Sequence, residues 1–444
     1  MTTALRPNII FIVADDLGFA DLGCYGGRAA RFGPVSPVLD ALAADGLLFT
    51  DGYSNSPVCS PTRFALMTAR YQYRLRGAAE EPINSRSRHS TVLGLPPEVP
   101  TLPSLLRGAG YRTALFGKWH LGYPPSFGPL RSGYEEFFGP MAGGVDYFTH
   151  CASSGAHDLW AGEQEQPQEG YLTDLISQRS VDYVQRMSAG AAAGTPFFLS
   201  MHYTAPHWPW ETRDDAALAP LLKQNLFHLH GGNIHTYQRM IHHMDEGIGQ
   251  VTQALRECSL LDNTLIVFTS DNGGERFSDN WPLVGGKMDL TEGGIRVPWI
   301  AYWPAAIPPG ATTAQHCMTM DWSATMLDVA GVTADPQYPL DGLSLATVLR
   351  EPRQQFNRPL YWRMNHRGQR ALRSGDWKYL RVDGHDYLFN LQSDARERAN
   401  LAQHEPTRLQ AMRQDWESWN AGMPAIPADA TVSLGYSAKD MPQR

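Results

Sequence analysis

Cysteine is scarce in this 444-residue chain: its five copies are scattered, odd in number and without a Cys-x-x-Cys pair. That pattern argues against a disulfide framework and against a zinc cluster. Basic residues are also few, since 37 lysines and arginines face 45 aspartates and glutamates, for a net charge of −8. Nucleic acids and anionic membranes need a broad basic surface, so neither is expected as a partner. A small anion needs only a local basic pocket and is not excluded.

Long hydrophobic runs are missing as well, because no stretch approaches the roughly 20 apolar residues of a membrane span. The apolar run at residues 9–14 is too short for the core of a signal peptide, and two aspartates follow it. We therefore expect a cytoplasmic protein. The chain has neither a Walker loop nor a Gly-x-Gly-x-x-Gly motif after a strand, which argues against a nucleotide-binding enzyme.

What the chain does contain is a series of short, β-rich apolar runs separated by helical patterns. The clearest strands are residues 7–14, 113–116, 196–203 and 264–270, and the clearest helices are residues 36–43, 171–187 and 234–255. Unbroken apolar strands indicate a parallel sheet buried on both faces. From about residue 336, short strands with turns between them indicate an antiparallel sheet, followed by a helix at residues 409–419.

We therefore predict an α/β protein with two parts. Residues 1–335 form a catalytic domain with a large, mostly parallel central sheet flanked by helices. Residues 336–444 form a small C-terminal α+β subdomain that contains the antiparallel sheet.

Polar side chains follow the predicted strands where each strand ends: Asp15, Asp16, Lys118, His120, His207, Asp271 and Asn272. In an open α/β sheet these strand ends gather at one edge, where ligands bind. Taken singly, each has a simpler interpretation, such as a solvated turn for the two aspartates or packing for the histidine. Two adjacent carboxylates after a core strand are costly to bury, however, unless a cation neutralises them.

The types of ligand indicate the metal. Oxygen atoms alone are offered by Asp15, Asp16, Asp271 and Asn272. Such a set suits Ca²⁺ or Mg²⁺ rather than zinc. The nearby basic residues suit a compact, strongly charged anion: Arg63, Lys118, His120, His207 and Lys287.

Cys59 lies between a predicted strand at residues 47–50 and a predicted helix that starts at residues 62–68. A lone cysteine is most often a buried thiol. At a helix N-terminus, however, free backbone N–H groups and the helix dipole favour negative charge, and Arg63 adds a fixed cation. The position therefore suits a reactive group as well as a packed one.

The string Cys59-Ser60-Pro61-Thr62-Arg63 resembles the modification signature of the type I sulfatases, which belong to the alkaline phosphatase superfamily. The resemblance covers nearly the whole chain and includes Asp15 to Gly26, Gly117 to Gly122, His207, Asp271-Asn272 and Lys287. It implies an alkaline-phosphatase-like fold and hydrolysis of a sulfate ester. It also favours Ca²⁺, with Mg²⁺ as the alternative, and implies that the metal is held by Asp15, Asp16, Cys59, Asp271 and Asn272.

The resemblance further implies how the nucleophile forms. Cys59 is oxidised after translation to formylglycine by a formylglycine-generating enzyme, and the aldehyde is held as its hydrate, one oxygen of which binds the metal. Arg63 orients this diol. One diol oxygen attacks sulfur in line.

The remaining roles implied by the resemblance concern the sulfate and the leaving group. Lys118 holds the sulfate, and His207 and Lys287 help the alcohol to depart. His120 then helps to remove the proton of the second hydroxyl, which expels sulfate and regenerates the aldehyde. A serine or an unmodified cysteine would be left as a stable sulfate ester.

Residues 123–170 are rich in glycine and proline, and we predict a long irregular excursion over the mouth of the sheet. Loops on a rigid scaffold carry specificity, although simple packing is the plainer interpretation. The predicted contacts to the organic part of the substrate are Asp146, Tyr147, His150, Trp208 and Trp210. An aromatic, sugar, choline or alkyl sulfate fits equally well, and assembly into a homo-oligomer is open.

Two other functions compete with a sulfatase. A related hydrolase of the same superfamily would act on phosphonate monoesters or phosphodiesters. A catalytically silent homologue would only bind anions and would keep Cys59 as a thiol.

Overall fold

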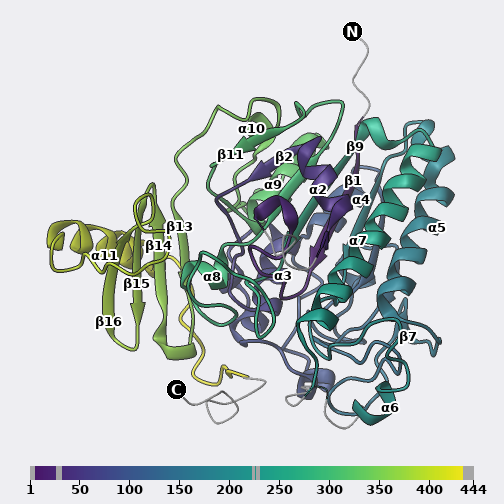
Figure 1. The fold of residues 1–444 in the computed structure, drawn as a ribbon, viewed down its shortest axis with the longest axis horizontal. Coiled ribbons are helices and arrows are strands. Elements are labelled where there is room, and N and C mark those ends of the chain that lie inside the picture. Colours follow the sequence, from purple (N-terminus) through teal and green to yellow (C-terminus); the bar gives the residue numbers. More distant parts are fainter. Residues whose placement is uncertain (1–5, 27–32, 223–225, 227–230, 434–444) are drawn as a thin grey trace.

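The computed structural model describes residues 6–26, 33–222, 226 and 231–433. A ten-stranded sheet forms its centre, in the order β11-β2-β10-β9-β1-β8-β4-β5-β6-β7 (Figure 1). The strands are β1 (Asn8–Ala14), β2 (Leu47–Phe49), β4 (Arg112–Gly117), β5 (Glu136–Gly139), β6 (Trp160–Ala161), β7 (Gln164–Glu165), β8 (Phe197–His202), β9 (Thr264–Ser270), β10 (Trp299–Tyr302) and β11 (Ala311–Thr313).

The middle of this sheet is parallel. Strands β9, β1, β8, β4 and β5 all run in one direction, whereas β10 is antiparallel to both β9 and β2. The predicted mostly parallel sheet is confirmed, and each of the four clearest predicted strands is present. Parallel order brings the carboxyl ends of β1, β4, β8 and β9 to one edge.

Helices cover both faces of the sheet, which explains why its central strands are apolar throughout. All seven residues of β1 are buried. Ile10 and Ile12 pack in one core and Ile9 and Phe11 in the other. The first core is covered by α2 (Pro37–Ala44), α5 (Leu172–Ala192) and α7 (Ile234–Glu257), and the second by α3 (Cys59–Thr68), α4 (Leu102–Gly108) and α9 (Thr319–Val329).

A second, antiparallel sheet lies to the left of the large one in Figure 1. Its strands, in order, are β13 (Leu360–Arg363), β14 (Arg370–Ser374), β15 (Trp377–Val382) and β16 (His385–Asn390). One face carries α11 (Pro406–Ala421), through contacts such as Trp416 with Leu388. The other face packs on the large part, since Leu380 shares a core with Leu290 and Ile295. The predicted antiparallel sheet is confirmed, and the boundary at residue 335 stays a prediction.

The shorter elements connect these layers: β3 (Gly52–Tyr53) and β12 (Cys317–Met318), which pair with each other, and α6 (Ala219–Leu222), α8 (Glu292–Ile295) and α10 (Ala346–Arg350). All five cysteines are free thiols. In the described part of the chain, every helix is too short or too polar to cross a bilayer.

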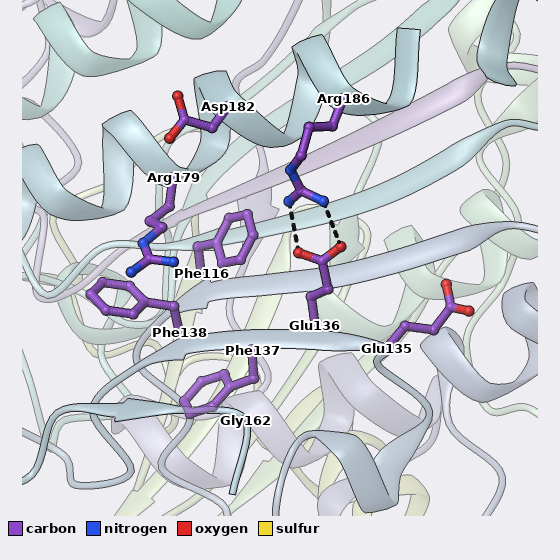
Figure 2. Close-up of a pocket in the computed structure, with 9 residues that line it drawn as sticks. All are labelled: Phe116, Glu135, Glu136, Phe137, Phe138, Gly162, Arg179, Asp182 and Arg186. Carbon is purple, nitrogen blue, oxygen red and sulfur yellow. Dashed lines mark hydrogen bonds and ion pairs between the residues drawn. The ribbon is translucent and has the colours of Figure 1, made fainter. Parts of the chain in front are cut away.

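A pocket of about 450 Å³ opens between β4, β5 and α5 (Figure 2). Arg186 pairs with both carboxylate oxygens of Glu136, at 3.0 and 2.7 Å. The Arg179 guanidinium lies 4.4 Å from the centre of the Phe138 ring. None of the residues that line this pocket belongs to the predicted site, so the site must be sought at the sheet edge.

Candidate active site at the carboxyl edge of the sheet

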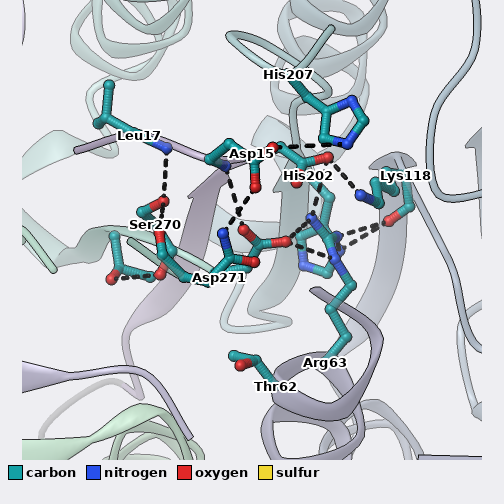
Figure 3. Close-up of polar contacts among 12 residues, drawn as sticks. Asp15, Leu17, Thr62, Arg63, Lys118, His202, His207, Ser270 and Asp271 are labelled. Atoms are coloured by element: carbon teal, nitrogen blue, oxygen red, sulfur yellow. Dashed lines mark hydrogen bonds and ion pairs between the residues drawn. The ribbon is translucent and has the colours of Figure 1, made fainter. Parts of the chain in front are cut away.

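Residues predicted to hold a metal come together where the parallel strands end, and Figure 3 shows Asp15 and Asp271 there. Asp15 and Asp16 follow β1, and Asp271 follows β9. One oxygen of each carboxylate and the sulfur of Cys59 all lie within 4.8 Å of one another. All four side chains are buried. The sheet topology therefore gathers residues that are more than 250 positions apart in sequence.

Asp15 has one oxygen paired and one unpaired. Its Oδ2 accepts a hydrogen bond from Lys118 Nζ at 2.5 Å, and the Nη2 of Arg63 lies 4.0 Å away. Its Oδ1 has no hydrogen-bond partner, although the residue is completely buried. An unsatisfied buried carboxylate oxygen costs free energy. The site is therefore incomplete without a further cation or donor near this atom.

Asp16 turns the chain so that both adjacent carboxylates face the site. Its φ of 62° lies in the left-handed region, whereas successive residues of an extended strand would point to opposite faces. Lys287 Nζ donates to Oδ2 and Asn272 Nδ2 to Oδ1, each at 2.7 Å. Burial raises the pKa of Asp16, but Lys287 and His207 outweigh it and hold the pKa at about 2.

Asp271 is held by Arg63, which follows Cys59 by one helical turn. Arg63 Nε and Nη2 donate to the same oxygen of Asp271, at 3.1 and 2.8 Å. Arg63 Nη1 also donates to the backbone oxygen of Lys118, at 3.1 Å. Burial, together with the charge of Asp15, raises the pKa of Asp271 to about 6. Arg63 thus links α3 to the ends of β9 and β4.

Cys59 is the first residue of α3, which begins three residues before the predicted helix start at residue 62, and is 2% exposed. The strand before it differs from the prediction. β2 ends at Phe49, and the short strand β3 and an extended Val58 stand between β2 and the helix. Burial raises the pKa of the Cys59 thiol to about 12, so an unmodified cysteine is neutral here at physiological pH.

The two predicted imidazoles each have one nitrogen engaged by a backbone oxygen. His120 Nε2 lies 2.6 Å from the oxygen of Ile83, and His207 Nδ1 lies 2.7 Å from that of Trp208. A nitrogen facing a carbonyl carries the proton, which leaves the other nitrogen as an acceptor. Burial lowers the pKa of His207 to about 3 and puts that of His120 well below its usual range.

Two adjacent glycines, which the sequence reasoning did not single out, pack over both imidazoles. A Cβ on Gly143 would lie 2.4 Å from Cε1 of His120, and one on Gly144 would lie 3.0 Å from Cε1 of His207. Any side chain at Gly143 would therefore displace His120. A pair of glycines inside the loop at residues 123–170 was the available signal.

His202 was also missed. It is the last residue of β8 and 1% exposed. Its Nδ1 lies 3.3 Å from Arg63 Nη1 and 3.1 Å from the oxygen of Lys118 (Figure 3). The rule that found Asp15, a polar residue where a core strand ends, would have found His202 too.

The predicted substrate contacts are mostly part of the wall of the site. Tyr147 is completely buried, and its hydroxyl donates to the backbone oxygen of His207 at 2.9 Å. Asp146 accepts hydrogen bonds from the backbone of its own loop, at Phe148 and Thr149. Both residues therefore support the site from behind.

The other three predicted contacts vary in exposure. Trp208 is half-buried, and its ring lies 4.2 Å from that of His207. Trp210 is buried against Phe277, and His150 is buried with Nε2 unpaired. Of the five, Trp208 has the surface best placed to meet a ligand, and contact with substrate stays a prediction for all of them.

Comparison with known families accounts for this arrangement. The sulfatase family model matches residues 7–332, which is most of the chain. A second model, described as N-sulphoglucosamine sulphohydrolase, C-terminal, matches residues 286–417. The matched ranges contain every residue of the predicted site.

Individual relatives agree. N-acetylgalactosamine-6-sulfatase of Sus scrofa is 33% identical over 81% of this chain and 69% of that protein. Arylsulfatase A of Homo sapiens is 31% identical over 94% of this chain and 83% of that protein. The crystal structure of Ps i-CgsB in complex with k-i-k-neocarrahexaose superposes with a TM-score of 0.82 at 31% identity, covering 93% of this chain and 92% of that one. The chain therefore belongs to the sulfatase family and is a sulfuric ester hydrolase.

Proposed function

We propose that this enzyme hydrolyses the sulfate ester of a saccharide, with formylglycine made from Cys59 as the nucleophile and Ca²⁺ as the metal. The observation that carries the proposal is the cluster of three carboxylates around the sulfur of Cys59, all within 4.8 Å. The names of two similar proteins support a sugar substrate, since one is an N-acetylgalactosamine-6-sulfatase and the other was crystallised with a neocarrahexaose.

The residues present fit a hard divalent cation. Asp15 Oδ1 and Asn272 Oδ1 are both buried and without a hydrogen-bond partner. Oxygen-only donors of this kind suit Ca²⁺. Asp15, Asp16, Asp271 and Asn272 would hold the ion together with the modified residue 59. When bound, it supplies Lewis acidity and offsets the repulsion among the carboxylates.

Separate residues of the chain then carry the individual steps of the reaction. A hydroxyl of the residue-59 diol forms a bond to sulfur as the bond from sulfur to the ester oxygen breaks, and the proton of that hydroxyl ends on the departing alcohol. Arg63 orients the diol, and Lys118, completely buried, donates to the sulfate oxygens. His120 Nδ1, which has no partner, accepts the proton of the second hydroxyl. The C–O bond to sulfate then breaks and the aldehyde returns.

Lys287 acts on the leaving group, and His207, neutral and with Nε2 as an acceptor, lies beside it. Burial lowers the pKa of Lys287, but Asp16 outweighs it, so the pKa lies well above its usual range and the amine stays charged. A charged donor of this kind stabilises the negative charge that develops on the departing oxygen. His207 Nε2 lies 3.6 Å from Asp16 Oδ2, on the same side of the carboxylate cluster as Lys287.

The test combines mass spectrometry with turnover. The protein is co-produced with a formylglycine-generating enzyme, and the peptide that contains Cys59 is analysed for the aldehyde. We expect the aldehyde, and faster turnover of nitrophenyl sulfate and of a sulfated N-acetylgalactosamine than of an aryl phosphonate. Full turnover by protein that carries only the thiol would overturn the proposed nucleophile. A faster rate on the phosphonate would favour the related hydrolase.

A further inference from the structure

Among the buried side chains that join the C-terminal sheet to the large part, Gln369 bonds directly to the segment beside Lys287. We propose that Gln369, just before β14, is a positioning residue that fixes the backbone beside Lys287, so that the C-terminal sheet controls how well the leaving group is stabilised. The inference rests on the proposed role of Lys287 at the leaving group.

Both the nitrogen and the oxygen of the Gln369 side-chain amide form hydrogen bonds to the segment that follows Lys287. Its Nε2 donates to the backbone oxygen of Met288 and its Oε1 accepts from the backbone N–H of Leu290, each at 2.8 Å. A longer bond of 3.3 Å joins Nε2 to the oxygen of His366, in the loop that leads to β14. The residue is 1% exposed. Breaking buried hydrogen bonds of this kind costs free energy, so Gln369 restrains this segment.

The segment bound by Gln369 needs support because its backbone is strained. Met288 has a φ of 75°, in the left-handed region that a residue with a side chain rarely adopts. Such a conformation is unfavourable and persists only where the surroundings impose it. On its other side, the N–H of Met288 donates to the oxygen of Pro57, two residues before Cys59. Met288 is thus held between the nucleophile segment and Gln369.

The chain up to Lys287 is held by longer bonds: the N–H of Lys287 donates to the oxygen of Gly274 and Asn280 Nδ2 donates to that of Gly285, each at 3.2 Å. Gly285, with a φ of 79°, and Gly286 have no side chains to pack. Lys287 itself is 15% exposed and reaches inward to Asp16 with its amine at 2.7 Å. If Met288 relaxed toward ordinary φ values, Lys287 would move with it. A displacement of roughly 1 Å at a catalytic group can cost about 100-fold in rate.

A purely structural role for Gln369 makes a different prediction. It would lower the amount of folded enzyme, or slow every substrate by the same factor. A positioning role through Lys287 slows poor leaving groups more, because they depend most on the donated charge. The dependence of kcat on the pKa of the leaving alcohol therefore separates the two.

The experiment uses Gln369→Met, which keeps the volume and deletes the amide's hydrogen bonds. The matched control is Gln315→Met. Gln315 is also 1% exposed, and its amide bonds the backbone of His316 and Phe356 at 2.8 to 3.1 Å. Neither partner belongs to the candidate site. Each variant, and Lys287→Ala, is assayed on a series of sulfate esters from nitrophenyl to alkyl.

We expect Gln369→Met to lose about 10-fold more kcat on the alkyl ester than on the nitrophenyl ester, in the same direction as Lys287→Ala and by less. Gln315→Met should show no such difference. If Gln369→Met loses the same factor in kcat on all esters, while the loss in Lys287→Ala depends steeply on the pKa of the leaving alcohol, the inference is wrong and the role of Lys287 stands. No dependence in Lys287→Ala would overturn the role of Lys287 and the inference with it. If Gln369→Met does not fold, Gln369→Glu keeps the acceptor and loses the donor to Met288, and the same outcomes decide.

Discussion

The active site and the interface beneath the C-terminal sheet each bury three carboxylates among three cations. The site cluster consists of Asp15, Asp16 and Asp271 with Arg63, Lys118 and Lys287. The interface cluster consists of Asp51, Glu292 and Glu397 with Arg296, Arg373 and Lys378. The numbers of carboxylates and of cations, and so the formal charge, are the same in both, and these do not explain why only one of the clusters is the candidate active site.

The difference lies in how the carboxylates are used. In the interface cluster, Lys378 Nζ lies 2.9 Å from both Glu292 and Glu397. The other oxygen of Glu292 accepts from the Tyr53 hydroxyl at 2.7 Å. Glu397 Oε1 has no hydrogen bond of its own but lies 2.9 Å from the Lys378 amine, whereas Asp15 Oδ1 in the site cluster has no partner and belongs to a residue close to Cys59 at a helix N-terminus. An unused acceptor close to Cys59, and not the number of charges, therefore distinguishes the site cluster from the interface cluster.

The largest expected effect on turnover comes from removing the thiol of Cys59, in the site cluster. We expect Cys59→Ala to lose about 10⁶-fold in turnover, the order seen when a catalytic nucleophile is deleted. The free energy of unfolding should change by only about 1 kcal/mol. Rates on an aryl sulfate and urea unfolding measure the two. Cys317→Ala, at a buried cysteine in β12, is the control and should keep its turnover. Activity of Cys59→Ala near the wild-type rate would refute the assignment.

One lysine from each cluster sharpens the comparison. Lys378→Met leaves two carboxylates buried without their shared cation, which should cost about 3–5 kcal/mol of stability. Its kcat per folded molecule should be nearly unchanged. Lys118→Met, measured with calcium present, should lose about 10²–10³-fold in kcat and little stability. Urea unfolding and kcat on both variants test this, and a greater loss of stability in Lys118→Met would contradict it.

The site cluster could be predicted from the sequence and the interface cluster could not. Asp15, Lys118 and Asp271 each follow a core strand, so a topological rule places them at one edge. Glu292 and Lys378, in contrast, are 86 residues apart, on a one-turn helix and an antiparallel strand. Nothing in the local pattern pairs them, because their contact depends on how the two sheets pack.

The same limit applies to the fold. The long central strands and helices were predicted because their patterns run over many residues. The edge strands β6 and β7 have two residues each and carry no readable pattern. The Gly143–Gly144 segment was missed because tertiary contacts shape it, including a bond from the N–H of Ala142 to Asp158. Local patterns predict elements, whereas loop shape depends on packing.

Calcium should stabilise through the site cluster only. At 100 times its dissociation constant, a ligand of the native state adds about 2.7 kcal/mol to the free energy of unfolding. We expect calcium to give the wild-type protein a gain of this order, and a chelator to remove both the gain and the activity. Asp15→Asn should lose the gain, whereas Glu292→Gln, in the interface cluster, should keep it. Thermal unfolding with and without calcium measures this, and the opposite pattern would place the metal elsewhere.

Asp158 extends the comparison to a buried carboxyl whose hydrogen-bond donors are neutral. Its oxygens accept from the N–H of Ala142 at 2.6 Å and from Nε1 of Trp160 at 2.8 Å. Burial raises the pKa of Asp158 from 3.8 to about 7, whereas Lys287 and His207 hold that of Asp16 at about 2. Two buried aspartates thus differ in protonation because only one of them faces a lysine.

This difference predicts a dependence of stability on pH. Between pH 3.8 and about 7 the folded chain keeps the Asp158 proton and the unfolded chain releases it. The unfolded state therefore binds fewer protons, and stability falls as the pH rises through this window, by at most about 1.4 kcal/mol per pH unit. Asp158→Asn removes the titrating carboxyl, so the free energy of unfolding of the variant lacks this dependence on pH. Losing one acceptor adds an offset of about 1–3 kcal/mol that does not vary with pH.

Urea unfolding of both proteins between pH 4 and pH 8 isolates the slope, because all other titrating groups are shared. A difference between the two proteins that stays constant across this range would show that Asp158 is charged when folded.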